Sequence, residues 1–218
     1  MKNYIIMVIG AIVLAGIPIL NLPLMWYQTF FHEFNHAIGA WLSGGGVLGL
    51  NMSWTSSGWV MYKDVDNHFL VQFIGYFGAP LWGALIFLVA RDGSDKLRSR
   101  LIVILALIIS IFSITYAADT GTLLISAFLV FMLIVLHAHK DLDRVVMVME
   151  FLGIYIMLNA IHFPLYILDD GDRLSDGVRM ALLSGLPEML IILVWWLTAV
   201  SCLIAVAWFP YNLGKRVT

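Results

Sequence analysis

Long apolar runs, separated by short polar connections, occupy almost the whole chain. Runs of this length approach or reach the ~20 residues that a helix needs to cross the hydrocarbon core of a bilayer. The pattern predicts an all-α integral membrane protein with six or seven transmembrane helices. The spans are predicted at 4–22, 24–43, 68–90, 101–118, 121–137, 145–164 and 180–209.

Residues 44–66 are the one long stretch without a helical pattern. Three consecutive glycines at 44–46 end the preceding helix, because glycine costs about 1 kcal/mol in a helix interior. Large apolar residues then alternate with small or polar ones from 48 to 54, and the turn-forming residues 55–58 lead into a second apolar run. This pattern predicts a short membrane-associated β-hairpin over about 46–63.

The composition supports a single polytopic membrane domain over residues 1–218. Hydrophobic residues make up 61% of the chain and charged residues 12%, whereas about 25% of a soluble globular domain is charged. The net charge of −2 provides no basic patch, so nucleic acid is excluded as a partner and the lipid bilayer is expected. Cationic residues cluster at 91–100, 140–144 and 215–216, and these connections are predicted to face the cytoplasm.

One short segment carries the chemistry: His32-Glu33-Phe34-Asn35-His36. On a helix, His32 and His36 lie one turn apart on the same face, and Glu33 is rotated by about 100° to flank them. This arrangement is typical of zinc hydrolases, in which two histidines bind the metal and the glutamate acts as general base. A polar helix face that lines a wet cavity or a proton path is the alternative interpretation.

A hydrolytic zinc site needs a third protein ligand and an open position for water. Asp169 and Asp176 both lie between the last two predicted spans, and the residues leave the choice between them open. Cys202 is the only cysteine, so a cysteine-based metal site and a disulfide framework are both excluded. Zn²⁺ is the expected cofactor, although histidine and carboxylate ligands also accept other divalent ions.

The expected reaction is hydrolysis of a peptide bond in a membrane-embedded or membrane-associated protein substrate. Glu33 is the expected general base and then the general acid. A transmembrane substrate must unwind before attack, because a helix buries its amides in internal hydrogen bonds. An open edge of the hairpin would hold the unwound segment by strand addition, with Val47, Leu48, Gly49 and Val60 as the expected substrate-binding residues.

These features together resemble the site-2 protease family of intramembrane zinc metalloproteases. The resemblance rests on the His-Glu-x-x-His segment on an early span, the glycine-ended helix followed by a hairpin, and a distant aspartate. Residues 75–83, Gly-Tyr-Phe-Gly-Ala-Pro-Leu-Trp-Gly, look like the third conserved helix of that family, with Gly83 where larger members carry an asparagine. Apart from the family, Gly75, Ala79 and Gly83 form a small-residue face that is expected to pack against another helix.

The resemblance also bears on the third ligand. Residues 164–169 look like the Pro-x-x-x-Leu-Asp-Gly element of the family, with Asp170 inserted before the glycine, which nominates Asp169. Residues 175–196, with Ser-Asp-Gly, Gly-Leu-Pro and a Trp-Trp pair, resemble the compact bacterial subgroup without a PDZ domain, which nominates Asp176. The second similarity is longer, so Asp176 is favoured. It also implies a location in the bacterial cytoplasmic membrane.

Two other classes of protein fit part of the pattern. A transporter or ion-translocating protein would also place ionisable residues in the bilayer, but it does not require this strict order and often contains inverted repeats. A catalytically silent adaptor would lack Glu33 or one of the histidines, and all three are present.

Overall fold

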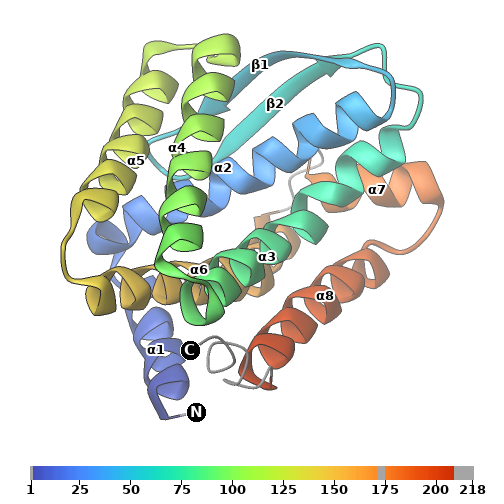
Figure 1. Cartoon of the computed structure of the whole chain (residues 1–218). Helices are drawn as coiled ribbons and strands as arrows, with labels where there is room; N and C mark the ends of the chain where they lie inside the picture. Colours follow the sequence, from blue (N-terminus) through green and yellow to red (C-terminus); the bar gives the residue numbers. More distant parts are fainter. Residues whose placement is uncertain (1, 171–174, 209–218) are drawn as a thin grey trace.

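The computed structural model describes residues 2–170 and 175–208, with side chains described over 4–162 and 175–208 (Figure 1). These residues form a helical bundle and one antiparallel hairpin, which confirms the predicted fold class. The elements are α1 (Lys2–Ala15), α2 (Pro18–Leu42), β1 (Gly46–Met52), β2 (Gly58–Lys63), α3 (His68–Asp92), α4 (Asp95–Tyr116), α5 (Thr120–Ala138), α6 (Leu142–Asp170), α7 (Asp176–Ser184) and α8 (Glu188–Trp208).

Five of the described helices, α3, α4, α5, α6 and α8, are long and apolar enough to cross a membrane, and α1 with α2 forms a sixth candidate that is bent by 110°. The bend lies at Gly16 and Ile17 rather than between residues 22 and 24, because Pro18 starts α2 at its first turn. The side chain of Asn21, in the first turn of α2, forms hydrogen bonds at this bend. Its amide donates to the Ala15 carbonyl at 3.3 Å, and its oxygen accepts the hydroxyl of Tyr155 on α6.

Helices α3 and α6 cross at a pair of glycines. A Cβ added to Gly83 would lie 2.6 Å from the Gly153 carbonyl oxygen, and one added to Gly153 would lie 2.6 Å from that of Gly83. The packing role predicted for the small residues of α3 is therefore confirmed at Gly83.

The hairpin forms where it was predicted, with Leu50 opposite Val60 and Met52 opposite Gly58. The alternation of its side chains is broken by an irregularity between Val47 and Gly49. Leu50 and Met52 are buried as the pattern predicts, but the side chain of Leu48 is 52% exposed. A bulge adds one residue to a strand, so residues before and after it no longer share a face as strict alternation implies.

The outer edge of β1 is covered by the connection between α4 and α5. The N–H of Ala118 donates to the Leu50 carbonyl at 2.8 Å, and the N–H of Met52 donates to the Thr122 hydroxyl at 2.9 Å. Asp119 caps α5 by accepting the N–H of Thr122, which lowers the pKa of its carboxyl below the usual range. It also accepts the side-chain amide of Asn51 on β1.

The last predicted span, 180–209, is two helices. Gly185 ends α7 with a φ of 71°, a left-handed conformation that glycine adopts without steric cost. Pro187 follows, and α8 begins at Glu188. This break makes α7 a short separate helix beside the hydrophobic α8. The N-terminus of α7 points into the bundle.

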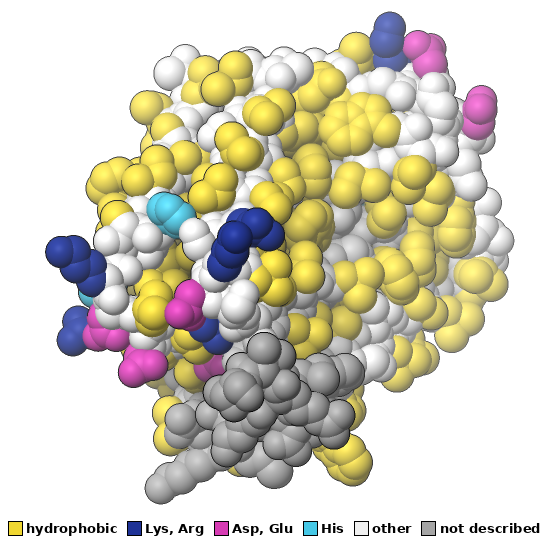
Figure 2. Space-filling view, viewed as in Figure 1, with side chains coloured by type: hydrophobic (Ala, Val, Ile, Leu, Met, Phe, Trp, Pro, Cys, Tyr) yellow, Lys and Arg dark blue, Asp and Glu magenta, His cyan; other side chains and the backbone are white. Residues whose placement is uncertain are grey.

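Apolar side chains are spread over much of the visible surface (Figure 2), as expected for a bundle in contact with lipid. Charged side chains gather near the α3–α4 and α5–α6 connections at one end, with a smaller group beyond the hairpin at the other (Figures 1 and 2). The N-terminus lies at the first of these ends (Figure 1).

Candidate metal centre

Helix α2 brings the chemically active residues into the interior of the bundle. His32 and His36 are 9% and 5% exposed, and Glu33 is 4% exposed. Their spacing places the two imidazoles one turn apart, with ring centroids separated by 4.6 Å and Nε2 atoms by 3.0 Å. The geometry predicted from the sequence is therefore present.

Asp176 completes the cluster from the first turn of α7. Ser175 caps this helix, since its hydroxyl accepts the N–H of Val178 at 3.3 Å. One carboxylate oxygen of Asp176 lies 3.1 Å from Nε2 of His32 and 3.2 Å from Nε2 of His36. The predicted alternative, Asp169, lies near the end of α6, and its side chain is outside the described residues.

The three side chains fit a divalent metal. One ligand atom from each of His32, His36 and Asp176 lies within 4.8 Å of the others. Ligands placed at about 2.0–2.1 Å around a tetrahedral ion are separated by about 3.3 Å, and the observed separations of 3.0, 3.1 and 3.2 Å are close to this value. Two imidazoles and a carboxylate are also the donor set of hydrolytic zinc sites.

The outer partners of the two histidines differ. Nδ1 of His36 lies 2.7 Å from the Val71 carbonyl of α3, and a donated proton there leaves Nε2 as the atom that could bind a metal. Nδ1 of His32 is buried and has no hydrogen-bond partner among the described residues. The ring of His32 packs instead on Tyr76, with centroids 4.3 Å apart.

Gly75 makes room for both imidazoles. A Cβ at this position would lie 2.5 Å from Cε1 and 2.6 Å from Nε2 of His36, and 2.9 Å from Cε1 of His32. Gly75 therefore lets α2 approach α3 closely, as predicted, and the atoms that it admits are those of the two imidazoles rather than of a helix backbone. No periodicity in the sequence identifies such a residue, because the contact depends on how α3 lies against α2.

Asn35, inside the His-Glu-x-x-His segment, fixes α2 against α3. Its side-chain amide donates to the Gly75 carbonyl at 3.4 Å, and its oxygen accepts the indole N–H of Trp82 at 3.1 Å. Gly78 permits this approach, since a Cβ there would lie 2.6 Å from Cγ of Asn35. These contacts, which the sequence pattern does not predict, fix the position of α2 along α3 at the site.

Glu33 faces the second strand of the hairpin. The backbone N–H of Val60 is directed towards its carboxylate. A Cβ on Gly58 would lie 3.0 Å from Cγ of Glu33 and 2.9 Å from a methyl of Thr29, so β2 packs directly on α2. The hydroxyl of Thr29 donates to the Ser56 carbonyl at 2.7 Å and anchors the hairpin turn.

The four predicted substrate-binding residues therefore do not share one environment. Val60, half-buried, adjoins Glu33, whereas Val47 and Gly49 are buried in β1 and Leu48 is exposed beside the bulge. Of the four, Val60 alone has a described contact with the cluster.

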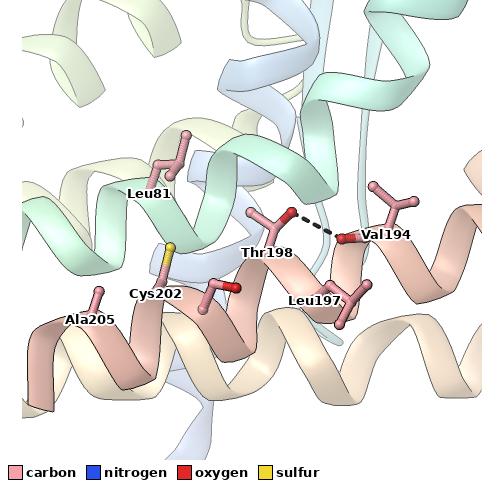
Figure 3. A pocket seen from close by; sticks show the side chains of 7 residues that line it. Leu81, Val194, Leu197, Thr198, Cys202 and Ala205 are labelled. Atoms are coloured by element: carbon pink, nitrogen blue, oxygen red, sulfur yellow. Dashed lines mark hydrogen bonds between the residues drawn. The ribbon is translucent and has the colours of Figure 1, made fainter. Parts of the chain in front are cut away.

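A groove of about 470 Å³ lies between Leu81 of α3 and the face of α8 from Val194 to Ala205 (Figure 3). The residues that line it do not include His32, His36 or Asp176. The candidate metal ligands therefore lie inside the bundle rather than in this lateral groove.

A polytopic membrane fold that buries a His-Glu-x-x-His helix against an aspartate defines a class of membrane metalloproteases. The model of the Peptidase M50B-like family matches residues 4–206, and the chain belongs to this site-2 protease family. Neither the search of curated proteins nor the search of solved structures gave a match. The resemblance expected from the sequence is therefore confirmed at the level of the family.

Proposed function

We propose that this protein is a zinc-dependent intramembrane endopeptidase in which His32, His36 and Asp176 hold the metal and Glu33 is the catalytic acid and base. The observation that carries the proposal is the convergence of the three ligand atoms within 4.8 Å, beside a buried Glu33. Membership of the M50B-like family supports the same reaction class.

The bound metal supplies a Lewis acid that polarises a peptide carbonyl and acidifies a water molecule. The chain supplies the remaining steps. Glu33 accepts a proton from the attacking water and returns it to the leaving amine. The burial of Glu33 excludes bulk water from this transfer, and the N–H of Val60 orients its carboxylate. The hydrogen bond from His36 to Val71 fixes the imidazole tautomer.

The proposed substrate is a transmembrane or membrane-associated protein whose scissile segment is extended. Strand β2 is the edge that passes Glu33, whereas the outer edge of β1 is bonded to the α4–α5 connection at Leu50 and Met52. We therefore favour β2 as the edge to which the substrate adds. The proposed location is the bacterial cytoplasmic membrane.

Glu33→Gln tests the chemical role. Glutamine keeps the shape of the side chain but cannot take a proton, so the variant should retain zinc, measured by elemental analysis, and lose cleavage of a transmembrane reporter by at least about 100-fold. Glu150→Gln is the matched control, because Glu150 is a half-buried glutamate on α6 away from the cluster. A wild-type protein without stoichiometric metal, or full cleavage by Glu33→Gln, would contradict the proposal and reopen the transporter interpretation.

A further inference from the structure

Three aromatic rings form a continuous contact from the metal-binding cluster to the last helix. The imidazole of His32 on α2 packs on Tyr76 of α3, and Tyr76 packs on Trp195 of α8 with centroids 4.7 Å apart. Tyr76 is 5% exposed and Trp195 is fully buried. The row therefore links helices α2, α3 and α8.

Trp195 also fixes α8 to α3 through a hydrogen bond. Its indole N–H donates to the Phe73 carbonyl at 3.1 Å, one turn before Tyr76. Leu81, further along α3, borders the groove that separates it from part of α8 (Figure 3). Trp195 is thus the described polar anchor between the two helices on the side of the metal-binding cluster.

The same contact holds the helix that carries the third ligand. Tyr76 and Trp195 share a buried cluster with Met180 of α7 and with Ile191 and Ile192 of α8. Met180 is fully buried and lies one turn after Asp176. Packing of this cluster therefore sets how far the first turn of α7 reaches towards the imidazoles.

His32 needs such support more than His36 does. His36 is oriented by its hydrogen bond to Val71, whereas Nδ1 of His32 has no partner among the described residues. Metal-binding histidines are ordinarily oriented by outer partners, whose loss lowers metal affinity by about 10- to 100-fold. Ring packing on Tyr76 is the described contact that takes this role for His32.

We propose that Tyr76 and Trp195 are positioning residues for the metal centre. Tyr76, backed by Trp195, holds the imidazole of His32 in its ligating orientation, and their cluster docks α7 so that Asp176 reaches the metal. This inference rests on the proposed zinc site, and it assigns to an aromatic contact the orienting role that a hydrogen bond has at His36.

The adjacent tryptophan provides a matched control. Trp196 follows Trp195 on α8, but its indole N–H donates to the Ile161 carbonyl of α6 at 2.8 Å. Both side chains anchor α8 by one hydrogen bond, but Trp195 is fully buried, whereas Trp196 is partly buried at the margin of the same cluster. Trp195 alone of the two contacts the aromatic row that ends at His32.

The test is zinc affinity of the purified full-length protein, measured by titration against a competing chelator, with thermal stability recorded in parallel. Trp195→Leu should raise the zinc dissociation constant by about 10- to 100-fold. Trp196→Leu should change it by less than about threefold, whatever its loss of thermal stability. Equal affinities for these two variants would overturn the inference.

A second pair of variants covers the case in which Trp195→Leu does not fold. Tyr76→Phe keeps the ring and should bind zinc like the wild type, whereas Tyr76→Leu removes the ring and should weaken binding by a similar factor. Equal zinc affinity of the two Tyr76 variants would also overturn the inference. Wild-type protein that binds no zinc would instead contradict the proposed function, which keeps the two failures distinguishable.

Discussion

Gly75 shows how a residue without a side chain shapes the candidate metal centre. It lies on α3 directly opposite the two imidazoles, and a methyl group there would overlap both rings. Backbone freedom does not explain this glycine, because it sits in the interior of a regular helix where alanine is preferred. The glycine is needed because the two imidazoles occupy the space that a larger side chain would fill.

Replacing Gly75 by alanine should therefore abolish or weaken metal binding. The added Cβ would lie 2.5 Å from Cε1 of His36 and force the ligand rings apart, so we expect at least a tenfold rise in the zinc dissociation constant, about the range for lost outer partners. Gly46→Ala is the control, since a Cβ there meets nothing within 4 Å. Similar zinc titrations for the two variants would show that the helices are further apart than described.

At the scale of elements, the hairpin and α2 form one unit. The start of β2 packs on Thr29 and Glu33, and the N–H of Val60 points to the Glu33 carboxylate. In an antiparallel pair, successive N–H groups face opposite edges. The N–H of Val60 therefore does not serve the ladder with β1, and the outer edge of β2 faces Glu33 at this point.

A proline scan distinguishes the two hairpin edges. Val60→Pro removes the N–H at the outer edge of β2 that also faces Glu33, so it should reduce cleavage of a transmembrane reporter about tenfold or more, with zinc content unchanged. Leu48→Pro, at the bulge of β1, should have little effect, because bulges tolerate proline. Impairment by Leu48→Pro alone would assign the substrate to β1, and normal turnover in both variants would exclude strand addition.

At the scale of the whole molecule, charge is divided between the two ends of the bundle. One end carries the cationic residues of the α3–α4 and α5–α6 connections, and the end beyond the hairpin carries few. The described cations at the first end are Arg91, Lys96, Arg98, Arg100, Lys140 and Arg144. Cytoplasmic connections are enriched in lysine and arginine, so this end is predicted to face the cytoplasm.

The N-terminus lies at the same end (Figure 1), because α1 and α2 form one bent pair rather than two crossings. Counting seven simple crossings from the sequence would place it on the opposite side. Since His36 lies in the last two turns of α2, next to the hairpin, the candidate metal centre is then predicted to lie in the half of the bilayer away from the cytoplasm.

Cysteine accessibility tests this orientation. In a Cys202→Ser background, a single cysteine at Asp66, beyond the hairpin, should react with a membrane-impermeant maleimide in intact cells. A single cysteine at Lys140, between α5 and α6, should react only after permeabilisation. The reverse pattern would place the hairpin and the metal centre on the cytoplasmic side.

Sequence by itself determined the features that depend on residues close along the chain. Apolar runs give the spans from α3 to α6, because burial in lipid requires about 20 apolar residues whatever their neighbours. Glycines 44–46 and the alternation after them give the hairpin. The four-residue spacing of His32 and His36 places both rings on one face of α2, since helix geometry is local.

Tertiary structure decided what depends on contacts between distant segments. Asp176 is 144 residues from His32 and reaches it only because Gly185 ends α7 as a separate helix whose Met180 packs beside Tyr76 and Trp195. The bulge that exposes Leu48 follows from pairing with β2. The space at Gly75 follows from the crossing of α2 and α3. Local periodicity contains no information about these approaches, because each is set by the packing of one complete element on another.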